Sequence, residues 1–272
     1  RQSLLLADLR FNAATRQAFG ALAIGHTALT LGRLAVTPAN GTSLLLQGLS
    51  LDSDSSVQGD YVDLRGQLAV DRIQSAQFAA TRAGYAVSFT HLHGPSLAAL
   101  LQAMRRTQRN LGAGRGAAAL QMLAIFRQYG GAVLAHEPVL QITRIGFVMP
   151  EGELRLSARV TVPALTGANL SGDAALAAVT RNLQAVADLR VDTALADKLL
   201  GRSGQGAALL QAQMQQLERV GYLRRDGSAY STHIDYQAGN LRINGLPYPP
   251  AVQSAAPPAA PPAGPPPAAV PR

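Results

Sequence analysis

The sequence has no cysteine and no tryptophan, and aromatic residues make up only 5% of its 272 residues. The absence of cysteine excludes disulfides, thiolate nucleophiles and cysteine-ligated metal sites. With so few aromatic residues, a core must be assembled mainly from Leu, Val, Ile and Ala. Hydrophobic residues nevertheless reach 47% of the chain, so the sequence predicts a folded protein with a sizeable core.

Common catalytic and cofactor motifs are also missing. The run Gly201–Gln205 lacks the second glycine of a nucleophile elbow, and Gly112–Gly116 fits neither a dinucleotide fingerprint nor a Walker loop. Asp52–Ser56 begins like a calcium loop, but Val57 stands where that loop needs glycine and Asp63 where it needs glutamate. The sequence therefore predicts a non-enzymatic protein with no catalytic residues and no bound cofactor.

Lysine is nearly absent, because Lys198 is the only one among 24 basic residues, and the formal net charge is +8. Acidic residues are missing between Asp71 and Glu137, so the arginines of that interval concentrate positive charge there. Some of them form a candidate anionic-surface patch, made of Arg105, Arg106, Arg109, Arg115 and Arg127. Such a patch suits anionic lipid headgroups or an acidic protein, although a solvated helix face has the same pattern. No aromatic residue lies between Arg105 and Arg115 to stack on bases, so we expect no nucleic-acid binding.

The same lack of acidic residues surrounds His91 and His93. Side chains two residues apart on a strand point the same way, and two neutral imidazoles so placed can share a metal ion. A third ligand would have to come from elsewhere in the fold, because the nearest acidic residues are Asp71 and Glu137. The sequence therefore favours a strand end that leads into a helix, with no metal site.

Hydrophobic periodicity predicts the order of the elements. Val62, Leu64, Leu68 and Val70 alternate with polar residues, which is typical of an antiparallel strand with one polar face. The spacing becomes helical after residue 94 and returns to alternation near residue 138. We expect strands over 1–93, a helical hairpin over 95–131, a β-hairpin over 138–163, helices over 173–221 with an optional short strand at 186–191, and a terminal hairpin over 228–248.

These elements predict an α+β fold. One or more antiparallel, curved β-sheets would carry the inserted helical hairpin and a second helical segment on their apolar face. Residues 1–250 are expected to form a single domain, or part of a larger one. Residues 251–272 hold eight of the sixteen prolines and are expected to be a disordered tail. No segment has the roughly 20 mostly apolar residues of a transmembrane helix.

Three motifs resemble landmarks of one known family. They are Tyr230–Pro247, Leu92–Leu97 before a helix, and Ile145–Gly152 before an alternating strand. Together they resemble the YdgA-like family, a set of Gram-negative envelope proteins of unassigned molecular function. The resemblance implies that this chain is the C-terminal half of a longer protein. It also implies a periplasmic location, with a tether to the inner membrane through an N-terminal anchor.

Composition, motif absence and resemblance together lead to an expected function. We expect a non-enzymatic module of the cell envelope with an interaction or structural role. Its partner would be a second copy of itself or another envelope protein, with an anionic lipid surface as a further candidate partner. The alternative is a β-sheet groove that binds or transfers a lipid-like apolar ligand.

Overall fold

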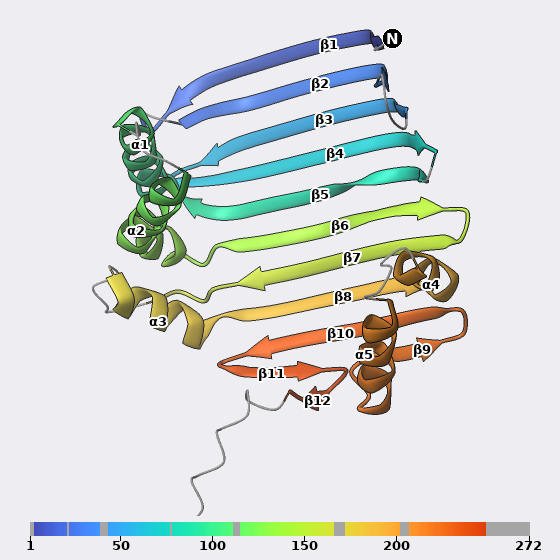
Figure 1. Ribbon diagram of the computed structural model, residues 1–272. Coiled ribbons are helices and arrows are strands. Elements are labelled where there is room, and N and C mark those ends of the chain that lie inside the picture. The colour runs from blue at the N-terminus through green and yellow to red at the C-terminus, as the bar shows by residue number, and fades with distance from the viewer. Residues whose placement is uncertain are drawn as a thin grey trace, which may run out of the picture.

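The computed structural model describes residues 3–20, 22–38, 43–76, 78–110, 115–165, 172–201 and 207–248. Within these residues twelve strands form one open antiparallel sheet, accompanied by five helices (Figure 1). The α+β class predicted from the sequence is therefore confirmed. The expected tail at 251–272 lies outside the described residues, and the domain division stays a prediction.

The strands are β1 (Ser3–Ala18), β2 (Leu22–Thr37), β3 (Leu44–Gln58), β4 (Tyr61–Ser75), β5 (Ala79–His93), β6 (Val139–Met149), β7 (Gly152–Thr161), β8 (Gln184–Asp192), β9 (Arg224–Asp226), β10 (Ala229–Gln237), β11 (Asn240–Ile243) and β12 (Leu246–Pro247). The helices are α1 (Gly94–Asn110), α2 (Arg115–Leu134), α3 (Gly172–Asn182), α4 (Thr193–Gly201) and α5 (Ala207–Arg219). The strands lie in the sheet in sequence order, except that β9 pairs beside β10 and off the main path.

Local sequence explains several of the turns between these strands. In the last hairpin, Gln237 is the register partner of Asn240, which leaves Ala238 and Gly239 as a two-residue turn. Both turn residues have positive φ, 50° and 83°, which is the combination of a type I′ turn. This turn has the twist that adjacent antiparallel strands need, and it joins β10 and β11 within the terminal hairpin predicted over 228–248.

The segment 173–221, predicted to be helical apart from an optional strand at 186–191, contains a strand of nine residues. β8 pairs with β7 along one edge and with β10 along the other. Ala185, Ala187 and Leu189 favour helix in isolation, but pairing on both edges outweighs that preference. The strand separates α3 from α4 and α5.

The two helices that follow β5 lie where the sequence predicts a helical hairpin. However, α2 continues through Gly130 and Gly131 to Leu134, beyond the end of the hairpin predicted over 95–131. A Cβ atom built at Gly130 would lie 3.2 Å from the ring of Phe126. The glycine therefore gives room to a neighbouring aromatic ring within the helix rather than terminating it.

Buried apolar residues form two clusters at opposite ends of the strands. In the first, Leu100 of α1 and Val133 of α2 join Val62, Leu92 and other strand residues. In the second, Leu195 of α4 joins Ala80 and Met149. Figure 1 shows α1, α2 and α3 near one end of the strands and α4 and α5 near the other. The helices therefore cover only parts of the sheet, and the N-terminal end of β1 is exposed at Leu4, Leu5 and Leu6.

Candidate ligand-binding face

A row of large apolar side chains crosses the middle of the sheet. Each member is the direct register partner of the next, so all lie on one face. We call these residues the apolar row: Phe11, Leu29, Leu51, Leu68, Tyr85, Ile145, Leu156 and Leu189. At a strand spacing of about 4.8 Å, a row over eight strands is about 34 Å long.

Apolar residues also flank the row on the same face. On one side, Leu9, Leu31, Leu49 and Val70 are successive register partners across β1 to β4. On the other side, the partners across β5 to β10 are Val87, Ile142, Ala158, Ala187 and Ile234. The Tyr85 hydroxyl is the only side-chain polar group within the apolar row. A continuous apolar strip therefore spans these strands.

The helices leave the apolar row partly open to solvent, whereas Leu31 and Val70 beside the row are buried. Phe11 is 67% exposed, Ile145 39% and Leu189 36%, although each occupies the interior of a strand. Neither buried cluster includes a member of the apolar row. Monomeric proteins rarely leave contiguous apolar surface uncovered without a functional reason. The strip is therefore the leading candidate for a binding surface among the described residues.

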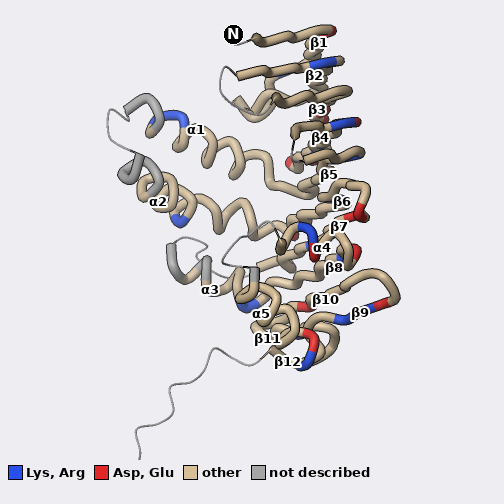
Figure 2. Tube along the Cα trace, turned by 45° about the vertical axis from the view of Figure 1, so that its right-hand side comes forward, with Lys and Arg blue, Asp and Glu red and all other residues tan. Residues whose placement is uncertain are grey.

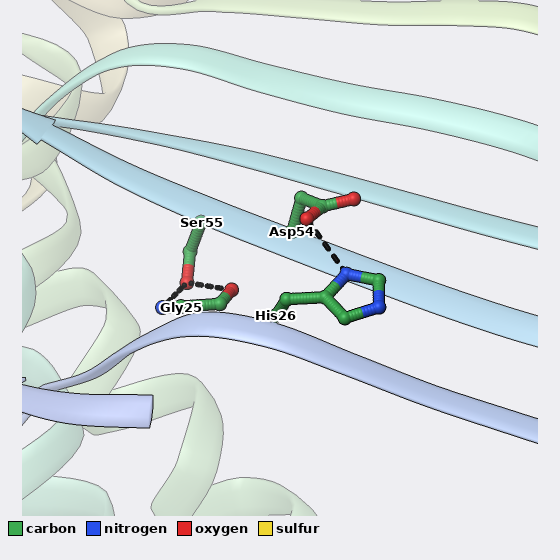
Figure 3. A network of polar contacts seen from close by, with 4 residues as sticks. All are labelled: Gly25, His26, Asp54 and Ser55. Atoms are coloured by element: carbon green, nitrogen blue, oxygen red, sulfur yellow. Dashed lines mark hydrogen bonds and ion pairs between the residues drawn. The ribbon is translucent and has the colours of Figure 1, made fainter. Parts of the chain in front are cut away.

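The opposite face of the sheet is polar. On β3, Ser50, Asp52 and Asp54 alternate with Leu51, and His26 Nδ1 lies 2.8 Å from Asp54 Oδ1 (Figure 3). Adjacent to this pair, the Ser55 hydroxyl accepts a hydrogen bond from the backbone N–H of Gly25 and donates one to its carbonyl oxygen. Ser55 belongs to the apolar side of β3, and these two bonds satisfy its hydroxyl there.

Gly25 is required at this position for two reasons. Its φ is +143°, and a Cβ atom there would lie 2.0 Å from the carbonyl oxygen of Ala14. A residue with a side chain would therefore push β1 and β2 apart beside the Ser55 hydroxyl.

Three of the five histidines gather at the end of β5. His91 and His93, singled out in the sequence, are joined by His136, which follows α2. The rings of His93 and His136 are stacked with centroids 4.2 Å apart, and the ring of Tyr61 packs against His91 at 4.0 Å. His93 Nδ1 also lies 2.8 Å from Ser96 Oγ. Sequence reasoning missed His136 because 42 positions and two helices separate it from His93.

Burial lowers the pKa of His136 below its usual value, and the nearby His93 and His91 lower it further. His91 itself has a positive φ of 63° at a register shift between β4 and β5, and its backbone N–H donates to Asp63 Oδ1. The described residues contain no group of three or more potential ligands placed to hold a metal ion. The absence of a metal site stays a prediction, and the rings form an aromatic contact cluster.

The candidate anionic-surface patch is divided between two helices. Arg105 and Arg106 are exposed on α1 and Arg127 is exposed on α2. Figure 2 shows basic positions on both helices in blue. The side chains of Arg109 and Arg115 lie outside the described residues. Beside Arg127, the apolar side chains Leu120, Leu123 and Phe126 are 70%, 55% and 46% exposed. No acidic residue occurs on either helix.

The other sequence candidates lie at separate places in the described residues or outside them. His233 Nδ1 on β10 lies 2.7 Å from Asp188 Oδ1 on β8. Asp52 and Asp54 lie inside β3, so the segment that resembled a calcium loop is a strand. Most of Gly201–Gln205 and of Gly112–Gly116 lies outside the described residues. No helix in the described part of the chain is long and apolar enough to cross a bilayer.

Comparison with known proteins gives one match. A family model described as "Bacterial protein of unknown function (DUF945)" matches residues 1–251. This match confirms the family resemblance drawn from the motifs in the sequence. No curated protein and no solved structure matches the chain. Its function therefore has to be argued from the geometry of the sheet.

Proposed function

The chain belongs to the DUF945 family of bacterial proteins of unknown function, and we propose that its apolar row binds the acyl chains of a lipid-like ligand. The observation that carries this proposal is the row of large apolar side chains that are register partners over eight strands, five of which are exposed. No catalytic role enters the proposal.

The chemistry of the strip favours acyl chains over a protein segment. A protein backbone lying across the strands would bring N–H and C=O groups that need hydrogen-bond partners. The backbone groups of β2 to β8 are already engaged with neighbouring strands on both edges, and the apolar row offers only the Tyr85 hydroxyl. An acyl chain needs no such partner, and its burial is favourable in proportion to the apolar area removed from water.

The helical hairpin offers a second contact with lipid. Exposed Leu120, Leu123 and Phe126 on α2 would enter the interfacial region of a bilayer, while Arg127 faces anionic headgroups. The acid-free α1 adds Arg105 and Arg106 to the same electrostatic attraction. A location in the periplasm with a tether to the inner membrane, as the family resemblance implies, would bring this surface close to membrane lipid.

The test is native mass spectrometry of protein purified from cells. We expect lipid to co-purify with the wild type, and Leu51→Glu or Ile145→Glu to reduce the bound fraction by about tenfold or more, because a carboxylate would be desolvated beneath the chain. Ser50→Glu is the matched control, since it adds the same charge to the neighbouring position on the polar face. Wild-type protein without lipid, or equal lipid in all variants, would refute the proposal.

A second candidate function rests on β1. This edge strand has sixteen residues, and its large apolar side chains are the most exposed of any strand, with Leu4 at 70% and Phe11 at 67%. Its outer edge has no strand partner among the described residues, so its N–H and C=O groups are available for strand addition. We propose a second copy of the chain as the partner.

A further inference from the structure

A depression of ≈ 350 Å³ lies on the polar face of the sheet, across β7, β8 and β10. Its lining includes Arg155, Arg190 and Arg224, together with Asp188, His233 and Asn244. Arg155 alternates along β7 with Leu154 and Leu156, so the depression is on the face opposite the apolar row. Its arginines therefore lie on the face opposite the proposed acyl-chain surface, and Leu189 is the one member of the apolar row in its lining.

The pairing register concentrates positive charge in one line. Arg155 is the direct partner of Arg190, Arg190 is the partner of Ser231, and Ser231 is the partner of Arg224. Like charges directly opposite each other on neighbouring strands are destabilising. The only carboxylate in the lining is Asp188, and it is already paired with His233 at 2.7 Å. Asp226 outside the lining offsets Arg190, so the positive charge over the depression comes mainly from Arg155 and Arg224.

The three arginines differ in the hydrogen bonds and ion pairs that they already make within the protein. Arg224 donates a hydrogen bond to the carbonyl oxygen of Asn244 at 2.9 Å, and Arg190 lies 3.5 Å from Asp226 Oδ2. Arg155 has no hydrogen bond or ion pair with another described residue. Its register partner on the other side is Gly146, so no side chain fills the space next to it on β6. The Arg155 guanidinium is therefore free to donate to a ligand.

We propose that this depression binds a phosphate group, with Arg155 as its principal ligand and with Arg190 and Arg224 as supporting donors. A guanidinium group presents paired N–H donors in a fixed plane, which suits the oxygens of a phosphate. Several such groups around one small depression favour a multiply charged oxyanion over a single carboxylate. The phosphate belongs either to a soluble phosphate ester or to a lipid headgroup.

The experiment uses the full chain with two probes. Inorganic pyrophosphate is titrated by calorimetry, and vesicles of phosphatidylcholine with and without phosphatidic acid are tested by flotation. Arg155→Gln removes the free charge, and Arg159→Gln is the matched control. Arg159 is another exposed arginine on the same face of β7 but is absent from the lining. We expect Arg155→Gln to weaken binding about tenfold, which corresponds to about 1.4 kcal/mol, and Arg159→Gln to leave it unchanged.

The two probes separate the two sources of phosphate. Arg155-dependent binding of pyrophosphate without vesicle flotation identifies a soluble ligand, and Arg155-dependent flotation without pyrophosphate binding identifies a lipid headgroup. Failure of the wild type to bind either probe overturns the inference, as does equal weakening by Arg155→Gln and Arg159→Gln. Circular dichroism of both variants checks that the sheet is intact.

Discussion

Leu195 and Ile234 represent the two environments that this sheet offers to an apolar side chain. Leu195 has no exposed surface and lies in the cluster beneath α4, whereas Ile234 is partly exposed beside the apolar row. We expect Leu195→Ala to lower the free energy of unfolding by about 2–5 kcal/mol, because it leaves a cavity in a packed cluster. Ile234→Ala should lower the free energy of unfolding by less than half of that amount. Urea denaturation measures the free energy of unfolding of both variants. Equal losses would show that the apolar strip is covered.

His136 gives the protein a predicted dependence on pH. Because burial and the nearby histidines lower its pKa below 6.5, the unfolded chain takes up a proton more readily than the folded one. The stability that neutral His136 contributes is fully present above pH 6.5. It is lost as the pH falls from 6.5 toward the pKa of His136 in the folded protein. Thermal unfolding should therefore occur at lower temperature in mildly acidic buffer. His136→Gln should reduce this fall, and an unchanged slope would contradict the assignment.

At the scale of one element, β1 carries the prediction of self-association. If Leu9 lies opposite Leu9 of an antiparallel second copy, then Asp8 of each chain lies opposite Arg10 of the other. Opposite charges at facing positions stabilise a strand pair, and this register places two such pairs around a two-fold axis. We expect light scattering to show a dimer that Arg10→Asp weakens by placing carboxylates opposite each other. Arg33→Asp on β2 is the control, and a wild type that is monomeric at all concentrations would contradict the prediction.

At the scale of the whole molecule, the sequence predicts elements better than it predicts sites. Alternation in β4 and the turn at Ala238-Gly239 depend on near neighbours, so local patterns are sufficient for them. The apolar row cannot be found in this way, because placing Ile145 beside Tyr85 depends on a register shift in β6 after two intervening helices. The line of Arg155, Arg190 and Arg224 likewise joins three strands whose order in the sheet had to be known first.

The strands follow one another in the sheet almost as they do in the chain, and this order has a consequence for folding and for variation in length. Most strands pair with the preceding strand of the chain through a hairpin or a helical connection, so their pairing does not depend on distant parts of the chain. Interactions between adjacent strands then dominate the fold, as interactions between adjacent repeats do in repeat proteins. A strand added beyond β1 would lengthen the apolar strip by one spacing of about 4.8 Å, with no rearrangement of the pairs already made.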